Sequence, residues 1–408
     1  MIFQKIIRRL ILSILYLFSP FFFIIIKLLK PLKIIRITPL YSNRYGHLVI
    51  NPELYLLEKR ENFRENKKYF DLFYSVRLGI CNQEMLNLWK KKIRIFPYYI
   101  LEPIDNFLKL KKKNNIHKVS YFNQKVRDLN GYLGKYPPSI SLNQEQINVC
   151  EKKLADYDID VKREKFVCLF NRDDAYLNST KKKKNWYYLS HHNYRIKSFE
   201  LAARRLSSRD IKVFRMGVEV EEKFDLNDRN IIDYANSKLR SELMDIYLAS
   251  NCFFGISCGT GSSHVAILNR RPIVDLNANL HHLLTFLDNS ILLSKGYFSN
   301  IKKRYLSLRE ILFYKEEQIR GRDQLDQNDI EMIDCSPEEI ADAIDEMNFR
   351  LDGNWNDSEE ILNLQKKFKD QNWKNIYQLK EEKPLFYHGE IRGRYSSTFL
   401  LKNQSWLN

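Results

Sequence analysis

The sequence lacks the cysteine and histidine spacings that hold a structural metal ion. Its six cysteines lie far apart, with no CxxC pair and no cluster with histidine: Cys81, Cys150, Cys168, Cys252, Cys258 and Cys335. This excludes a zinc site of the usual ligand spacing and a disulfide framework. No Asp-x-Asp segment stands out as a metal site either, so we expect no metal ion and reduced thiols in a protein that faces a cytosol.

Acidic residues are absent from the first 36 positions, although the whole chain carries 50 of them. The same segment holds seven of the positive charges that give a formal net charge of +17: Lys5, Arg8, Arg9, Lys27, Lys30, Lys33 and Arg36. An excess of positive charge requires an anionic partner. Its concentration at one end favours a membrane surface with anionic lipids over a nucleic acid.

Charge is also absent from residues 10–26, LILSILYLFSPFFFIII. As a straight helix this run rises about 25 Å, short of a hydrocarbon core of about 30 Å. No small-x-small cleavage site follows, which argues against a removed signal peptide. With basic residues on both flanks and Ser19-Pro20 in the middle, we expect a kinked, re-entrant or monotopic anchor at the cytoplasmic face of the inner membrane. A single transmembrane helix is the alternative.

The remaining length and the 44% hydrophobic content are sufficient for two folded domains. Short apolar runs alternate with helical patterns, which predicts an α/β protein with doubly wound parallel sheets. We expect an anchor at 1–31, a Rossmann-like domain at 32–145, a second at 146–350, and a tail at 351–408 that packs back on the body. The expected strands are 33–37, 69–74, 93–96, 166–170, 211–215, 231–234, 252–257 and 273–276, and the expected helices are 48–57, 83–90, 104–112, 198–206, 240–250, 264–268, 306–314 and 337–351.

The segment 252–276 reads as strand, glycine loop, helix and strand, which is one βαβ unit. Its loop consists of small residues: Cys258, Gly259, Thr260, Gly261, Ser262 and Ser263. Glycines let a ligand approach the backbone, and amides at a helix start favour an anion. His264, in the first helical turn, could donate to a phosphate or pack beneath the loop. A phosphate cradle is the favoured interpretation, and a plain βα turn is the alternative.

Other polar residues follow expected strands, where ligands bind in open α/β sheets. They are Arg172, Asp173 and Asp174 after one strand, Arg215 and Gly217 after another, and Asp233 after a third. His191, His192 and Arg195 precede a helix nearby. An arginine offers a planar fork of donors suited to a diphosphate. Each arginine alone is more often a surface ion-pair former, and the histidine pair is equally well explained as a solvated loop.

Several motifs carry a family resemblance. The helix 242–248 followed by CFFGISCGTGSSHVAILNRRPIV resembles the donor half of GT-B glycosyltransferases. More narrowly, NRDDAYL, HHNYR-IKSFE-A, FRMG, IIDYANSKLRSELMDIYL and GHL-NPE-YL together resemble a family of bacterial glycosyltransferases linked to surface polysaccharide. This resemblance covers most of 44–60 and 165–280. The first domain is also similar to heptosyltransferase-like enzymes, whose catalytic carboxylate follows a glycine; the corresponding pair here is Gly46-His47, with histidine in place of aspartate.

The resemblance implies a GT-B-like pair of Rossmann-like domains facing a cleft. It further implies a Leloir-type transferase that uses a nucleotide-sugar as co-substrate and a glycan or lipid-linked glycan as acceptor. The donor diphosphate would meet the glycine loop, His264, Gly217 and Arg172, Arg195 or Arg215, without a metal or other cofactor. His47 is the candidate base, with Asp173 and Asp174 as alternatives. Arg44, Gly46, His191 and His192 would lie on the acceptor side.

Two other functions stay open at this point. A GT-B-shaped enzyme could modify glycans by another reaction, such as pyruvyl transfer from phosphoenolpyruvate. A non-enzymatic membrane-tethered protein could instead bind acidic polymers through the lysine runs Lys109–Lys113 and Lys181–Lys184.

Overall fold

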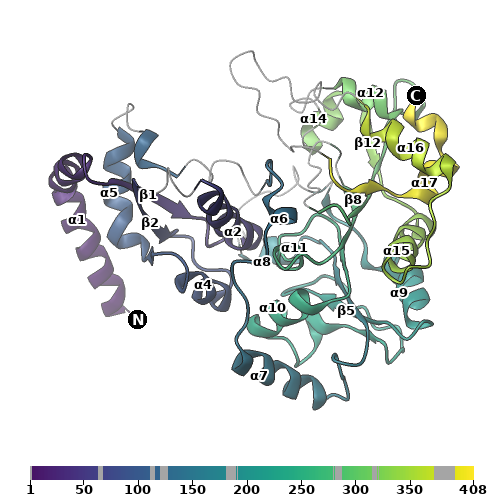
Figure 1. The fold of residues 1–408 in the computed structure, drawn as a ribbon, viewed down its shortest axis with the longest axis horizontal. Coiled ribbons are helices and arrows are strands. Elements are labelled where there is room, and N and C mark those ends of the chain that lie inside the picture. Colours follow the sequence, from purple (N-terminus) through teal and green to yellow (C-terminus); the bar gives the residue numbers. More distant parts are fainter. Residues whose placement is uncertain are drawn as a thin grey trace. The chain divides into compact units, whose positions relative to one another are not determined.

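The computed structural model describes residues 2–62, 68–110, 115–119, 127–180, 190, 192–278, 280, 287–314, 319, 321–371 and 391–408. The chain divides into two compact units, each with its own parallel sheet (Figure 1). Met1–Val126 and Tyr136–Gln144 form unit 1, while Arg127–Lys135 and Glu145–Asn408 form unit 2. The lysine run 181–184, most of the run 109–113 and His191 lie outside the described residues. Both units are of the α/β class expected from the sequence.

Unit 1 is built on three parallel strands in the order β1-β2-β3. Helices follow each strand and connect it to the next, as parallel strands require. The elements are β1 (Ile34–Leu40), α2 (Tyr45–Glu61), β2 (Tyr69–Ser75), α4 (Gln83–Lys90), β3 (Ile95–Phe96) and α5 (Tyr98–Leu110), with a 3-10 turn at Asn115–His117.

The two faces of the unit 1 sheet bury different side chains, because successive residues of a strand point to opposite sides. Ile37 and Tyr74 belong to a cluster with Leu101 and Ile104 of α5. On the other side Arg36 makes a bidentate pair with Asp71, with N–O distances of 2.5 and 2.9 Å. The hydroxyl of Tyr55 on α2 donates to the same carboxylate at 2.6 Å.

The N-terminal helix α1 runs unbroken from Ile2 to Leu29, 28 residues. The helix does not turn back at Ser19-Pro20, so the re-entrant form of the expected anchor is wrong. Pro20 lacks the N–H that would bond to the carbonyl of Tyr16, and the hydroxyl of Ser19 donates to that carbonyl instead. By length and composition, Ile6–Leu29 could cross a membrane.

Unit 2 contains seven strands in the order β13-β9-β8-β7-β4-β5-β6, and all the pairings are parallel. They are β4 (Phe166–Phe170), β5 (Lys212–Met216), β6 (Ile231–Ile232), β7 (Gly255–Ser257), β8 (Ile273–Ala278), β9 (Ile291–Ser294) and β13 (Arg394–Tyr395). Leaving aside β13, the chain builds outward from β4 in one direction and from β7 in the other. This is the 3-2-1-4-5-6 order of dinucleotide-binding sheets, with its switch point between β4 and β7.

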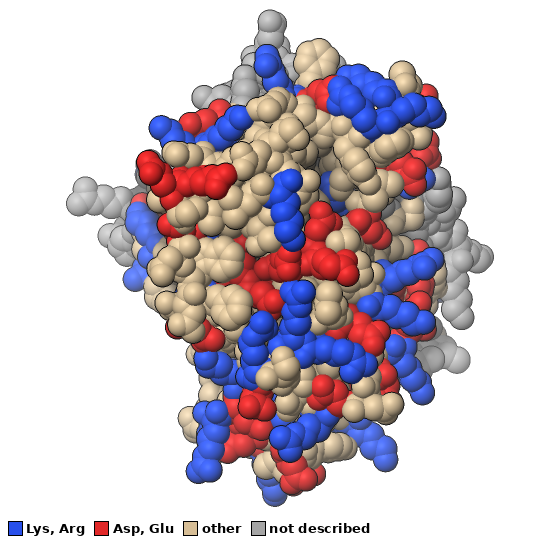
Figure 2. Space-filling model, turned by 90° about the vertical axis from the view of Figure 1, so that its right-hand side faces the viewer, with Lys and Arg blue, Asp and Glu red and all other residues tan. Residues whose placement is uncertain are grey.

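Helices cover both faces of this sheet. On one face α9 (Glu200–Ser207) and α15 (Pro337–Leu351) share a buried cluster with β4, β5 and β8. The other helices between the strands include α10 (Glu242–Asn251) and α11 (His264–Leu268), which contact each other. Arg205 of α9 and Arg209, which follows the helix, pair with Asp345 of α15 at 2.9 and 2.6 Å. Figure 2 shows the side of the molecule where α9, α15 and α17 lie, and both signs of charge interleave over it.

The remaining parts of unit 2 complete its edges. Short helices α6 (Tyr132–Lys135), α7 (Gln144–Ala155) and α8 (Ala175–Thr180) precede or follow β4. A small antiparallel sheet, β11-β10-β12, follows β9, and α16, β13 and α17 end the chain. The small sheet comprises β10 (Gly296–Ser299), β11 (Arg304–Tyr305) and β12 (Ile330–Ile333), and α12 (Leu308–Phe313) and α14 (Arg322–Gln327) lie between β11 and β12 in the chain. Helices α16 (Glu359–Lys369) and α17 (Ser397–Lys402) come after the small sheet. Tyr395 of β13 shares a hydrogen bond of 2.8 Å with Ser294 of β9.

Most expected elements are confirmed. The strand at 166–170 and the helices at 83–90, 264–268 and 337–351 have the expected bounds. Two expected helices need correction: the helix expected at 48–57 begins at Tyr45 and ends at Glu61, and the helix expected at 104–112 begins at Tyr98 and ends at Leu110. Each helix contains an interior proline, Pro52 in α2 and Pro103 in α5, and because proline usually begins or breaks a helix, the sequence pattern predicted a start that is too late.

Candidate anion-binding site at the switch point of unit 2

Two segments singled out by the sequence meet at the switch point. Residues 171–174 follow β4, and residues 258–263 follow β7. The two strands are neighbours, with Phe170 opposite Ser257 in the register, so their carboxyl ends lie level with each other. Crossovers from β4 and β7 leave toward opposite sides, and this geometry opens a crevice for ligands in such sheets.

Hydroxyl groups hold the loop after β7 in shape. Ser257 donates to the Oγ of Ser263 at 3.0 Å, and Ser263 donates to the carbonyl of Thr260 at 2.8 Å. Thr260 and Ser262 share a further hydroxyl contact of 3.0 Å. Gly259 has a φ of +67° with open space where a Cβ would stand, so its backbone angle and not crowding requires glycine.

Three consecutive backbone donors in this loop are left for a ligand. Within the described part of the chain, the N–H groups of Thr260, Gly261 and Ser262 have no hydrogen-bond acceptor. Gly261 and Ser262 are half-exposed. Successive amides of this kind form anion-binding concavities. Helix α11 has only five residues, so its dipole adds less than the sequence suggested, and the amides themselves are the main feature.

Beneath the loop lies a cavity of about 20 Å³, room for about one water molecule. His264 and Asp275 both line it. The Nδ1 of His264 lies 3.1 Å from the carbonyl of Thr260, so the ring packs under the loop with its Nδ1 turned back to the backbone. Burial lowers the pKa of His264 to about 4, although its backbone hydrogen bonds act to raise it.

Asp275, in β8 opposite Ser257, is a titratable residue that the sequence analysis did not assign. Burial raises its pKa to about 7, against the lowering effect of a hydrogen bond with the backbone of Gly259. A carboxyl group beneath this loop whose pKa is close to neutral pH is a candidate functional group. Its signal in the sequence was a single acid in the otherwise apolar run 273–276.

Arg215 is fully buried at the end of β5. Its NH1 donates to Asp233 at 3.1 Å, and its NH2 lies 3.8 Å from Asp173. This arginine therefore connects the loops after β4, β5 and β6, and its predicted contact with a diphosphate stays a prediction. Gly217 leaves room for the same loops, because a Cβ there would lie 2.6 Å from Val220 and 3.2 Å from Ala235.

The two aspartates after β4 have different surroundings. Asp173 accepts from the backbone N–H of Ala175 and of Glu221, both at 3.1 Å, so each carboxylate oxygen already has a backbone donor. Oδ1 of Asp174 is buried and has no hydrogen-bond partner among the described residues. Asp174 is thus the better placed of the two for proton transfer.

The other predicted residues of unit 2 flank this region. The backbone carbonyl of Arg172 accepts from the N–H of Tyr194 at 2.9 Å, which brings the segment before α9 to the end of β4. Arg195 is exposed and precedes the 3-10 turn Ile196–Phe199. His192 is half-buried.

In unit 1, His47 lies in the first turn of α2 and is half-buried. Its Nδ1 is 3.3 Å from the side-chain amide of Asn51, one turn further along the helix, and its ring packs near Tyr41 at 5.4 Å between centroids. Arg44, which precedes α2, is exposed, and Gly46 is buried. Asn51 is 1% exposed and was not singled out by the sequence.

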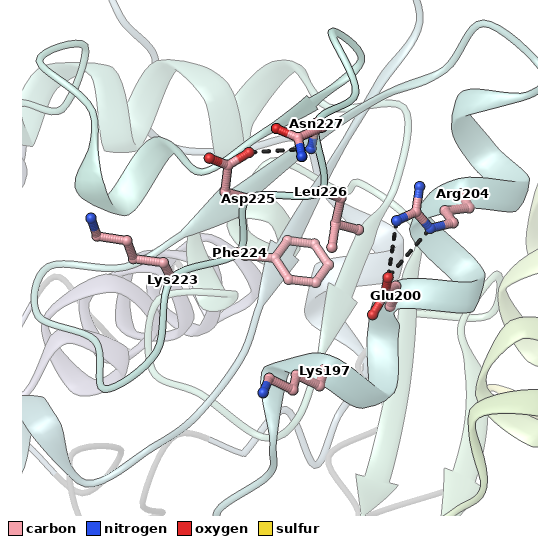
Figure 3. A pocket seen from close by; sticks show the side chains of 8 residues that line it. All are labelled: Lys197, Glu200, Arg204, Lys223, Phe224, Asp225, Leu226 and Asn227. Carbon is pink, nitrogen blue, oxygen red and sulfur yellow. Dashed lines mark hydrogen bonds and ion pairs between the residues drawn. The ribbon is translucent and has the colours of Figure 1, made fainter.

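A wider hollow of about 300 Å³ lies beside α9 (Figure 3). Phe224 and Leu226 form its apolar side, and Lys197 and Lys223 lie at its margin. Arg204 there is already paired with Glu200 at 3.0 Å. The hollow shares no lining residue with the loop at 258–263, and its mixed charge does not favour a diphosphate.

Among the described residues, no group of three or more His, Cys, Asp or Glu side chains could hold a metal ion. The fold and the loop together define an α/β protein with a dinucleotide-type parallel sheet and a candidate anion-binding turn at its switch point.

No family model and no curated protein matches this sequence. The solved structures that are similar to this chain include the following three. A glycosyl transferase of family 9 from Veillonella parvula DSM 2008 has a TM-score of 0.43 at 11% identity, covering 78% of this chain and 98% of its own. The ADP-heptose lps heptosyltransferase II of E. coli has a TM-score of 0.40 at 11% identity, covering 78% and 100%.

The third is the dodecameric iron-containing heptosyltransferase TibC in complex with ADP-D-β-D-heptose, with a TM-score of 0.36 at 12% identity, covering 78% of each chain. These similar structures are all glycosyltransferases. Every TM-score is below 0.5, so these similarities do not establish the function of this chain, and its own geometry is the basis for a proposal.

Proposed function

We propose that this chain is a membrane-associated glycosyltransferase of GT-B type that binds a nucleotide-sugar at the switch point of unit 2. The supporting observation is the set of three backbone donors at Thr260, Gly261 and Ser262, presented beyond the carboxyl end of β7. A diphosphate is the ligand class that such a loop suits, and its position in the sheet is where nucleotides bind in this strand order.

In the reaction, the bond between the anomeric carbon and the diphosphate oxygen breaks, and a bond to the acceptor hydroxyl oxygen forms. Negative charge develops on the leaving diphosphate. The loop amides are already oriented toward such charge and need no reorganisation, so they stabilise the transition state more than the ground state. Arg172, which is half-buried, and Arg195, which is exposed, are the cations that can add to this charge stabilisation, whereas Arg215 supports the loops.

The acceptor hydroxyl must lose its proton to a base. His47 is our first choice, since imidazole exchanges protons near neutral pH. It can act through Nε2 only when Nδ1 carries the proton, and this requires the Asn51 amide to turn its oxygen toward the ring in place of the Nδ2 that faces Nδ1 at 3.3 Å. Asp174 is the alternative, because one of its carboxylate oxygens has no competing donor in the described chain.

We further propose that the acceptor is a lipid-linked or growing surface glycan, met at the cytoplasmic face of the membrane. The supporting feature is α1, whose outer side chains are apolar and whose flanks are basic. Attachment to the membrane would keep the enzyme where such acceptors are made.

The matched variants Ser262→Asp and Ser262→Asn test the loop. Ser262 is half-exposed, and both substitutions have nearly the same size. The aspartate adds a negative charge next to the three amides and should abolish thermal stabilisation of the detergent-solubilised protein by nucleoside diphosphates and nucleotide-sugars, while the asparagine should retain most of it. Equal melting temperatures without ligand verify the fold.

Two results would overturn the proposal. One is the absence of any response of the wild type across a panel of nucleotide-sugars. The other is stabilisation by phosphoenolpyruvate alone, which would assign the same loop to pyruvyl transfer.

A further inference from the structure

Helix α1 is attached to unit 1 along one side. The hydroxyl of Tyr16 accepts from the Nδ2 of Asn106 at 2.8 Å and lies 3.4 Å from the NH2 of Arg77. Toward one end Arg8 lies over the ring of Tyr99, 6.0 Å from its centroid, and toward the other Phe23 packs edge-on against Phe107 at 5.6 Å. Figure 1 shows α1 beside α5.

The attachment ends in a buried cluster. Ile26 is 5% exposed and belongs to the same cluster as Ile37 of β1 and Leu101 and Ile104 of α5. Contacts therefore extend from residue 8 to residue 26, which is about 27 Å of helix. Helix α1 is a part of unit 1 and not a free stalk.

The opposite side of α1 is an exposed apolar stripe. Its members recur every three or four residues, which places them on one face of a helix. They are Phe3, Ile7, Leu10, Ile14, Leu17, Phe21, Ile24 and Leu28, each between 39% and 76% exposed. An apolar patch of this extent on a protein surface marks an interaction site.

Positive charges lie at both ends of the stripe. Arg8 and Arg9 are near its start, Lys27 and Lys30 near its end, and no acidic residue occurs before Glu53. Anionic headgroups attract such residues by about 1 kcal/mol each. Both ends of α1 are thus suited to the same anionic surface.

The polar contacts on the inner side argue against a crossing. If Tyr16 lay at the middle of a bilayer, its partners Asn106 and Arg77 would lie there too. Arg77 is 48% exposed in its ion pair with Glu102. Charged groups at that depth cost about 2.5–3.5 kcal/mol each or more. A helix in the plane of the interface keeps them in water.

We propose that α1 lies flat in one leaflet of an anionic membrane, with its apolar stripe among the acyl chains and unit 1 on the water side. Helices of this kind sit about 5–10 Å into the headgroup boundary. Both termini of α1 are then on the same side of the membrane. This inference concerns attachment and does not depend on the sugar chemistry.

Vesicle flotation tests the surface. Full-length protein is mixed with phosphatidylcholine vesicles, with or without an equal part of phosphatidylglycerol. Leu17→Glu with Phe21→Glu should reduce binding at least tenfold, and Arg9→Glu with Lys30→Glu should remove only the preference for phosphatidylglycerol. Leu362→Glu, an exposed leucine of α16 at 53% exposure, is the matched control and should bind like the wild type.

Nucleotide-dependent thermal stabilisation of every variant separates this inference from the proposed function, since the stripe variants should keep it. Unchanged vesicle binding by Leu17→Glu with Phe21→Glu would overturn the inference. So would a wild type that forms dimers through the stripe and leaves vesicles unbound.

Phe3→Cys and Lys30→Cys, each on a background with Cys81→Ser, test the flat arrangement in cells. Cys81 is the one half-exposed native thiol among the six, and the other five are buried. A membrane-impermeant maleimide added outside should label neither position in intact cells and both after detergent has dissolved the membrane. Labelling of position 3 from the outside would show a crossing and overturn the inference.

Discussion

At the scale of single residues, the cavity under the glycine loop holds two groups whose titrations oppose each other. The pKa of His264 is lowered to about 4, so the folded protein resists its protonation. The pKa of Asp275 is raised to about 7, so the folded protein retains a proton that the unfolded chain releases above about pH 4. Between about pH 4 and 6.5 the two effects on stability therefore nearly cancel.

Single substitutions should expose each effect. In Asp275→Asn only His264 remains, the unfolded chain binds the extra proton, and the free energy of unfolding should rise with pH from 4.5 to 6.5. In His264→Gln only Asp275 remains, the folded chain binds the extra proton, and stability should fall with pH over the same range. Each slope approaches about 1.4 kcal/mol per pH unit at most. Urea unfolding in detergent measures both slopes; equal slopes in the two variants would contradict the assignment.

The choice between His47 and Asp174 as base can also be tested at a single residue. In Asn51→Asp a carboxylate would face Nδ1 of His47, hold its proton there and raise the pKa of the imidazole by about 1 unit or more. If His47 is the base, the acidic limb of the pH profile of kcat/KM should move up by the same amount. A profile that keeps its position, with the protein folded, would favour Asp174.

At the scale of elements, β7 depends on Gly255, a glycine that lies in the strand and not in the loop after it. A Cβ at Gly255 would lie 2.6 Å from Ile273 and 3.3 Å from Phe170, on the two neighbouring strands. Close approach of side chains from β4 and β8 fills the space above β7. The sheet at the switch point is therefore packed around a position without a side chain.

Gly255→Val should lower the free energy of unfolding by about 1–3 kcal/mol, the usual range for overpacking a core. Gly134→Ala is the matched control, because the nearest atom to its Cβ would be 3.5 Å away. Thermal unfolding measures both. A stability loss for Gly134→Ala as large as that for Gly255→Val would show that the crowding at β7 is not the cause.

At the scale of the whole molecule, the chain consists of two units with separate cores, and α1 belongs to the core of the first. Phe22, Phe23 and Ile26 of α1 pack against the cluster formed by Ile37, Tyr74 and Leu101. Removal of α1 would expose that cluster to water.

A chain without residues 2–31 should therefore be less stable in unit 1. The deletion should not simply yield a stable, water-soluble protein. Limited proteolysis should cut residues 32–110 faster in the truncated chain than in the full chain in detergent, while unit 2 keeps its resistance. Equal protection of both units would show that α1 is only an appendage. The full chain carrying Leu17→Glu, whose side chain points outward at 76% exposure, is the control and should be protected like the wild type.

The sequence by itself determined the local elements, because they follow from short-range patterns. Alternating apolar runs predicted β4, β5, β7 and β8, and the glycine loop after β7 was recognised from its composition. Apolar length predicted the N-terminal helix, but the effect of Pro20 depended on a hydroxyl one residue away that compensates for the lost backbone bond.

Only the tertiary structure decided what lies next to what. The order of strands placed the loops after β4 and β7 side by side, and it buried Arg215 between Asp173 and Asp233. It also placed Asp275 under the glycine loop and joined one side of α1 to α5, which left the other side apolar and exposed. These facts depend on pairings between residues distant in the chain, because burial sets both the pKa of a carboxyl group and which face of a helix stays exposed.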